Sequence, residues 1–234
     1  MAAVMGSVNK VFDFDLATKK VTQAWSGEGL QAAIAVDGTG EHFAITSGLQ
    51  ATSVDIYARQ PAGFQRLARL DPPGTLGDLQ AYALSFDRLD SESPFLAVAW
   101  GDSDGTQLVL TAYSVSKGGV NTTWSHHATC PNGTGFNFVM QPGLAVTAGG
   151  EMIAVGDWGC QATQEQQGKL LVFRGRGGDG ATPLLEATLL GQVWAVDVDA
   201  DPKAKMAYVS AGSWASKVPM EPAQVSTWSI PLPD

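Results

Sequence analysis

Charged residues are scarce in this sequence, in which Asp, Glu, Lys and Arg together make up 16% of 234 residues. The basic residues form no run, and the formal net charge is −9. Because nucleic-acid binding depends on Lys and Arg at phosphates, this balance argues against a nucleic-acid partner. No apolar run approaches the roughly 20 residues that span a bilayer, so we expect no membrane insertion.

Common catalytic motifs are also missing. The sequence contains no Gly-x-Ser-x-Gly elbow, no phosphate-cradling glycine loop and no His-Glu-x-x-His. His42 stands alone, and the adjacent His126 and His127 would point to opposite faces of a strand. We therefore predict no catalytic residue, no metal site and no cofactor.

The sequence does contain one phrase repeated four times, at a spacing of roughly 50 to 56 residues. Each copy has a short apolar strand, a tight turn and a second apolar strand. Helical periodicity is absent over any long window, and residues 2–5 and 163–167 are expected to form at most short turns. The first strands of the four copies lie at residues 33–37, 83–87, 143–146 and 193–197.

This repeat predicts a single all-β domain, a β-propeller of about four four-stranded antiparallel blades. We letter the strands of a blade a to d in chain order. One strand is left over if the two ends combine into a blade, so we expect an incomplete or open part of a larger propeller. Its exposed edges could join copies into a homo-oligomer. Alternatively, the N-terminal strands form an extra edge hairpin. The predicted units are a partial blade of c and d strands at 1–29, blades at 30–78, 79–135 and 136–190, and a blade lacking strand d at 191–234.

Three segments carry a family resemblance: Met152–Gly156, Gly168–Phe173 and Gln192–Val198. They resemble WD-type repeats, and still more the propellers of the quinoprotein dehydrogenase-like group, such as the quinoprotein amine dehydrogenase beta chain. The resemblance implies a ring of blades and usually a binding or scaffolding role. Only some members of that group carry a cofactor.

Aromatic and acidic residues recur in the predicted loops between strands b and c. In a propeller these loops share one face with the links between blades, where ligands usually bind. The aromatic rings could form a stacking shelf for a flat ligand. Alternatively, each Trp packs between its own blade and the next. The residues of this predicted site are Trp100, Asp102, Asp157, Trp158 and Trp214.

The two cysteines predict a disulfide bond. Cys130 lies in the link that enters the third full unit, and Cys160 lies in the b-to-c loop of the same unit, so both should lie on one face. The bond would close a loop of about 30 residues and contribute about 3 kcal/mol. The alternative is a pair of half-buried thiols.

Two features of the sequence bear on the cellular compartment. Asn121 and Asn132 each begin a glycosylation acceptor motif. Together with the predicted disulfide, they favour an extracellular or secretory compartment. The first ten residues do not have the pattern of a signal peptide.

These observations favour a non-enzymatic propeller module that binds a protein or a small polar ligand. A second hypothesis is a cofactor-binding, quinoprotein-like oxidoreductase. A third is a structural segment of a larger secreted or cell-surface protein.

Overall fold

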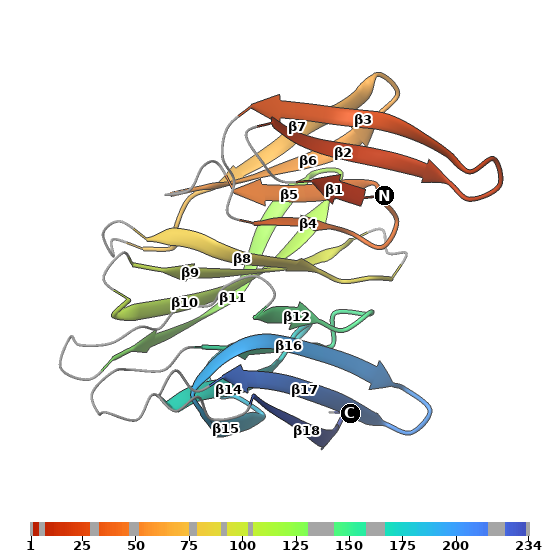
Figure 1. Cartoon of the computed structure of the whole chain (residues 1–234). Coiled ribbons are helices and arrows are strands. Elements are labelled where there is room, and N and C mark those ends of the chain that lie inside the picture. The colour runs from red at the N-terminus through yellow and green to blue at the C-terminus, as the bar shows by residue number, and fades with distance from the viewer. Residues whose placement is uncertain are drawn as a thin grey trace.

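The predicted all-β fold is confirmed. In the computed structural model, the described part of the chain contains strands and turns but no helix, and so no helix that could cross a membrane. The strands form five antiparallel sheets (Figure 1). The structure describes residues 2–4, 8–28, 33–46, 52–74, 79–89, 93–102, 105–130, 143–157, 167–214 and 223–232.

Strands follow one another in chain order across every sheet, so each sheet is an antiparallel meander. Sheet 1 contains β1 (Ala2–Val4), β2 (Val8–Asp15) and β3 (Lys20–Glu28). Sheet 2 contains β4 (Ile34–Val36), β5 (His42–Thr46), β6 (Val54–Gln60) and β7 (Gly63–Leu70). Sheet 3 contains β8 (Gln80–Phe86), β9 (Phe95–Gly101), β10 (Gln107–Ser116) and β11 (Gly119–Thr129). Sheet 4 contains β12 (Leu144–Val146), β13 (Met152–Gly156), β14 (Gln167–Arg174) and β15 (Leu185–Leu190), and sheet 5 contains β16 (Gln192–Asp201), β17 (Met206–Trp214) and β18 (Gln224–Pro231).

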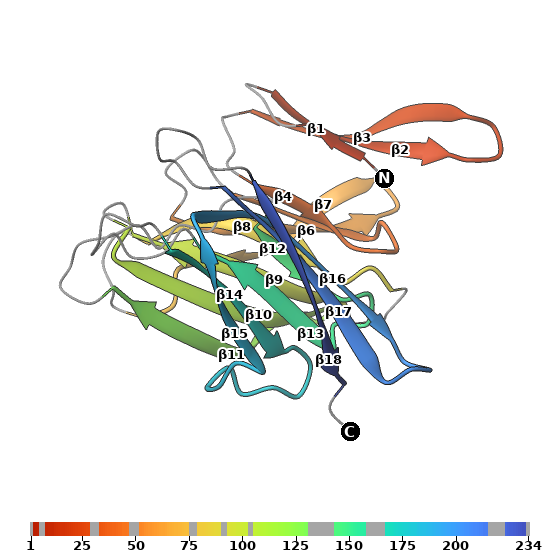
Figure 2. The same cartoon turned by 60° about the horizontal axis from the view of Figure 1, so that its bottom comes forward.

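The first strand of each sheet is the inner strand of a propeller blade. β1 contacts β4, β4 contacts β8, β8 contacts β12, and β12 contacts β16. In Figure 1 the inner strands β4, β8, β12 and β16 follow one another from top to bottom. Figure 2 shows the remaining strands of the sheets fanning away from this line. This is the arrangement of propeller blades side by side around an axis.

The hydrophobic core lies between neighbouring sheets rather than at one centre. All seven residues of β9 are buried, because one face of sheet 3 packs on sheet 2 and the other on sheet 4. Leu110 and Phe95 belong to the cluster shared with sheet 4, which also contains Phe173. Fully burying a side chain of this size contributes about 1.5 to 3 kcal/mol, so the inter-sheet clusters hold the blades together.

The N-terminal unit differs from its prediction. Residues 2–4 form the strand β1 instead of a turn, and β1 pairs antiparallel with β2. The unit is therefore a three-stranded sheet whose inner strand lies beside β4, and not a pair of outer strands. A run of three residues is too short to show the alternation that identifies a strand in sequence.

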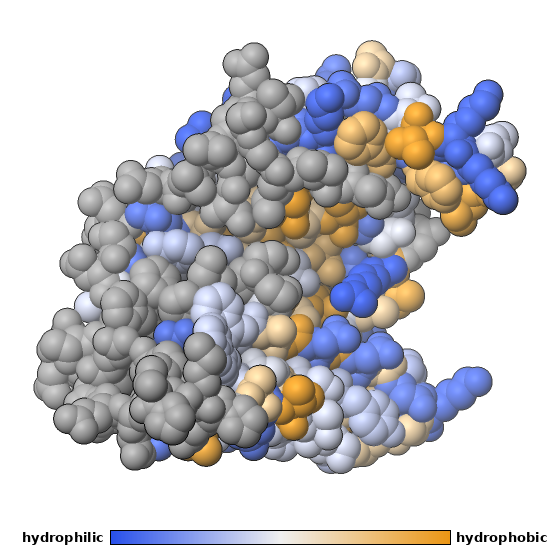
Figure 3. Space-filling view, viewed as in Figure 1, coloured by the Kyte–Doolittle hydropathy of each residue, from blue (hydrophilic) through white to orange (hydrophobic). Residues whose placement is uncertain are grey.

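The five sheets form an arc. Sheet 1 packs on sheet 2 at one end, and sheet 5 packs on sheet 4 at the other. The β2–β3 and β16–β17 hairpins extend toward the same side of the molecule, and the space-filling view is hollowed between their hydrophilic tips (Figure 3). On the inner side, Arg88 of sheet 3 lies 3.9 Å from Asp197 of sheet 5, so the arc curves tightly.

Candidate functional site

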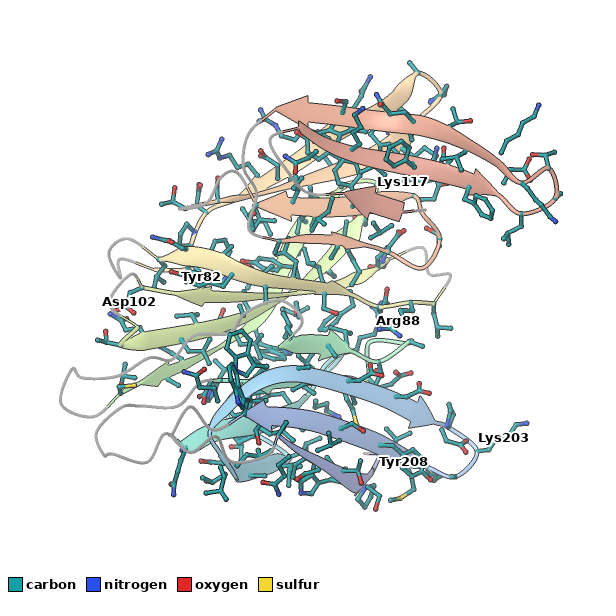
Figure 4. The ribbon with its side chains drawn as sticks, viewed as in Figure 1. Tyr82, Arg88, Asp102, Lys117, Lys203 and Tyr208 are labelled. Atoms are coloured by element: carbon teal, nitrogen blue, oxygen red, sulfur yellow. The ribbon has the colours of Figure 1, made fainter. Side chains whose placement is uncertain are left out.

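One edge of the arc carries the aromatic residues that could contact a ligand. At this edge the inner strands begin and the second strands end, because Gln80 pairs with Gly101 in sheet 3 and Gln192 pairs with Trp214 in sheet 5. We call it the aromatic edge, defined by residues 80–82, 100–102, 192–194 and 214. It lies opposite the β16–β17 turn, as the positions of Tyr82, Asp102 and Lys203 show (Figure 4).

Two inner strands carry a β-bulge at the same place. The register of β8 shifts between Ala81 and Ala83, which leaves Tyr82 as the extra residue. The register of β16 shifts between Val193 and Ala195, which leaves Trp194 as the extra residue. A bulge re-aims the side chain that it carries and is common next to binding sites. Both sheets therefore present an aromatic ring by the same backbone device.

In sheet 5 this device produces an open aromatic pair. The rings of Trp194 and Trp214 lie 6.2 Å apart at an interplanar angle of 50°. Trp214 is 40% exposed, and Trp194 is half-buried. Trp214 thus exposes part of its ring to solvent beside Trp194, and Gln192 is the register partner of Trp214 on β16.

In sheet 3 the equivalent position is closed. Gly101 replaces the tryptophan opposite Gln80, and the Tyr82 ring lies against it, since a Cβ at Gly101 would be 3.3 Å from Tyr82 Cε2. The Tyr82 hydroxyl donates to Gln80 Oε1 at 3.1 Å. Burial, and then the negative charge of Asp102, raise the pKa of Tyr82, so its phenol remains protonated and able to donate.

Trp100 is fully buried, so the prediction that its ring belongs to a ligand shelf is wrong. It packs in the cluster between sheets 2 and 3 with Val54 and Leu79. The alternative interpretation, a tryptophan that fills the wedge between blades, is correct for this residue. Its strand β9 is covered on both faces, and this leaves no side chain of the strand free for a ligand.

The two predicted aspartates hold loops in place. Asp102 Oδ1 accepts hydrogen bonds from the backbone N–H groups of Thr106 at 2.6 Å and Gln107 at 3.0 Å, and its Oδ2 accepts from the Thr106 hydroxyl. Asp157 is buried, and its Oδ1 accepts from the Lys169 N–H at 2.8 Å. Both carboxylates thus fix the start of the third strand of their sheet.

Other predicted residues remain partly untested. Trp158, Cys160 and Asn132 lie outside the described residues, so the disulfide stays a prediction. Cys130 is buried just after β11, with its Sγ 3.9 Å from the Gly105 carbonyl oxygen. Asn121 lies exposed on β11, as a glycosylation acceptor must.

Sequence reasoning missed Tyr82 and Trp194. The signal was present as a repeated phrase, Gln80-Ala81-Tyr82-Ala83 and Gln192-Val193-Trp194-Ala195. The sequence of each phrase is also that of an ordinary apolar strand, because a bulge is defined by the register with the partner strand and not by a residue type of its own.

The opposite edge of the arc is built from turns that lock neighbouring sheets. The buried carboxylate of Asp37 accepts hydrogen bonds from Thr39 Oγ1 at 2.9 Å and the Glu41 N–H at 3.0 Å, and its Oδ2 lies 2.9 Å from His42 Nδ1. Burial alone would raise the pKa of Asp37, but the hydrogen bonds from His42 and Thr39 hold that pKa below its usual range. Asp37 therefore remains a charged anchor of its turn.

Two arginines at this edge make equivalent contacts, which we call arginine clasps. Arg176 donates one hydrogen bond to the Gly149 carbonyl oxygen of its own sheet. It donates another to Asp87 Oδ2 of sheet 3, at 2.8 Å. Arg59 bonds the Gly40 carbonyl of its own sheet and forms two bonds to Asp13 of sheet 1, at 2.6 and 3.0 Å. Both arginines therefore link neighbouring sheets. Among the described residues, no group of three His, Cys, Asp or Glu side chains is placed to hold a metal ion.

No protein-family model and no curated protein sequence matches the chain. Among solved structures, the chain is similar to alpha-L-arabinanase of Penicillium chrysogenum (10% identity, TM-score 0.49), TolB of Acinetobacter baumannii (13%, 0.47) and Synechocystis apocarotenoid oxygenase (12%, 0.49). The matches cover 98%, 96% and 86% of this chain.

The chain spans 67%, 51% and 46% of the lengths of these three structures, in the same order. All three are β-propeller folds. In this chain the order of the sheets and the contacts between their first strands define the propeller arrangement.

Proposed function

We propose that this protein is a non-enzymatic binding module whose Trp194–Trp214 pair takes a small polar ligand with a flat face, such as a sugar ring or a planar heterocycle. The observation that carries the proposal is the 40% exposure of Trp214, whose ring lies beside that of Trp194 on the bulged strand β16. A tryptophan that served only to fill the core would be covered, as Trp100 is.

The chemistry of the pair fits such a ligand. Two indole faces supply stacking area, and aromatic contacts of this kind contribute about 0.5 to 1.5 kcal/mol beyond their buried area. Gln192 adds a donor and an acceptor at the rim, which is the mixture of apolar walls and few polar groups typical of ligand sites. Indole rings and amide groups can hold a ligand without carrying out a reaction on it. This favours a binding module over the oxidoreductase alternative.

Titration of the intrinsic fluorescence tests this proposal. Panels of soluble oligosaccharides and of nucleosides are added to the full chain, and we expect a member of one panel to change tryptophan emission saturably. The Trp214→Ala variant should bind that compound at least about tenfold more weakly, which corresponds to 1.4 kcal/mol.

Tyr208→Ala is the matched control. Tyr208 lies on the same strand and the same face as Trp214 and is 52% exposed, but it is six residues from the aromatic edge. Its replacement should leave affinity unchanged. The proposal fails if neither panel contains a binder, or if the Trp214→Ala variant binds as tightly as the natural protein.

A further inference from the structure

The outer strand of sheet 5 is an edge of unusual regularity. Sheets 2, 3 and 4 each place a fourth strand beyond the third, namely β7, β11 and β15. In sheet 5 the described strands end at β18, whose eight residues pair with β17 without a register shift. The backbone groups on the far side of β18 are therefore arranged as a straight row that another strand could bind.

The other outer strands carry protection that β18 lacks. Proteins blunt sheet edges with charges, bulges or prolines, since a plain edge pairs with other chains. Residues 224–231 contain no charged side chain, and the only proline is the last residue. Elsewhere, β3 carries Lys20 and Glu28 and a bulge, β7 carries Arg66 and Arg69 and a bulge, β11 carries a bulge, and β15 carries Glu186.

One face of β18 packs toward sheet 4 and the other faces solvent. β15, the outermost strand of sheet 4, contacts β17, the middle strand of sheet 5. On β18 itself, Trp228 and Ile230 face the cluster shared with sheet 4. The alternate residues Val225 and Thr227 face solvent, and Val225 is 75% exposed. Among the described strands β18 pairs only with β17, so an added strand would extend sheet 5.

We propose that β18 pairs antiparallel with β18 of a second copy of this chain, across a twofold axis perpendicular to the sheet. The two fifth sheets then form one continuous sheet of six strands. Such an isologous contact is self-complementary, because each strand offers the other the same row of donors and acceptors. The whole chain has a net charge of −9, but β18 is uncharged, so two copies meet at this strand without like charges opposing each other.

Light scattering during size exclusion tests this pairing with the full chain at low and high concentration. At high concentration we expect a mass of twice the 24.5 kDa chain. Thr227→Lys adds a charge next to the centre of β18 on the exposed face, so it should restore the mass of a single chain. Ser210→Lys is the matched control, because Ser210 is the register partner of Thr227 on the interior strand β17. That variant should remain a dimer.

A single-chain mass for the natural protein at every concentration would overturn the proposal. So would a Thr227→Lys variant that still dimerises, because the contact would then lie elsewhere. Circular dichroism checks that the variant keeps its strands, and Ser229→Lys on the same face of β18 replaces it if it does not. Hydrogen exchange gives an independent measurement: amides of β18 should be protected in concentrated protein and exchange faster on dilution, whereas no change with concentration contradicts the pairing.

Discussion

At the scale of single residues, the two arginine clasps show how burial determines the contribution of an ion pair to stability. Asp87 is fully buried, and burial raises its pKa against the opposing effect of Arg176. Asp13 is partly exposed, and the hydrogen bond from Arg59 holds its pKa below the usual range. Losing the partner is costly only where the remaining carboxylate cannot reach water.

We therefore expect Arg176→Met to destabilise the fold by about 3 kcal/mol, the lower end of the range for a broken buried ion pair because Arg176 is itself partly exposed. The pKa of Asp87 in the folded state lies above its unfolded value, so protonation favours the folded state. The cost should thus be largest at neutral pH and shrink as the pH falls. Urea unfolding at neutral and mildly acidic pH measures both effects.

Arg59→Met is the control for this prediction, with an expected cost within about 1 kcal/mol, as for exposed ion pairs. The lowered pKa of Asp13 makes this small contribution present at neutral pH and lost in acid. Equal costs for the two arginine variants would contradict the role that we assign to burial.

At the scale of elements, the turns between inner and second strands set the distance between neighbouring sheets. The Gly38 N–H donates to the Asp87 carbonyl at 3.2 Å, and a Cβ at Gly38 would lie 2.0 Å from the Arg88 carbonyl oxygen. The glycine is therefore required by the close approach of sheets 2 and 3. The sequence predicted a turn at Asp37-Gly38 but could not show that another sheet touches it.

We expect Gly38→Ala to lower the free energy of unfolding by about 2 kcal/mol, within the usual cost of overpacking, because the backbone of sheet 3 must move. Gly118→Ala, in the β10–β11 turn, is the matched control. A Cβ there has only the Ser116 hydroxyl within 4 Å, at 3.7 Å, so this change should be neutral or stabilise by up to about 1 kcal/mol. Thermal unfolding of both variants measures this difference. A Gly38→Ala variant as stable as the control would contradict the close approach of sheets 2 and 3 at Gly38.

At the scale of the whole molecule, stability rests on contacts between successive sheets. The core clusters lie between sheets 1 and 2, 2 and 3, 3 and 4, and 4 and 5. Contacts of this kind make each sheet dependent on its neighbours, as in other repeat architectures. A covalent link between segments far apart in sequence therefore adds stability to more than one blade.

The predicted bond between Cys130 and Cys160 belongs to this scale. Intact mass under denaturing conditions should show two alkyl groups added only after reduction, and reduction should lower stability by about 3 kcal/mol for a loop of about 30 residues. Alkylation of the denatured protein without reductant would show free thiols and contradict the bond.

Local patterns along the chain were enough to predict the repeat, the all-β class and most of the strands and turns, because the alternation of apolar residues and the placing of turn-forming glycines are local properties. The sequence also placed Trp214 at the end of a second strand, as the structure does, while the role of this residue in ligand binding stays a prediction. The packing of the sheets set the exposure of each tryptophan: Trp100 is buried between sheets, Trp194 is half-buried and Trp214 is 40% exposed. Burial depends on which sheets pack against each other. The direction of the Tyr82 and Trp194 side chains depends on a one-residue change of register. Neither property can be predicted from the local sequence pattern.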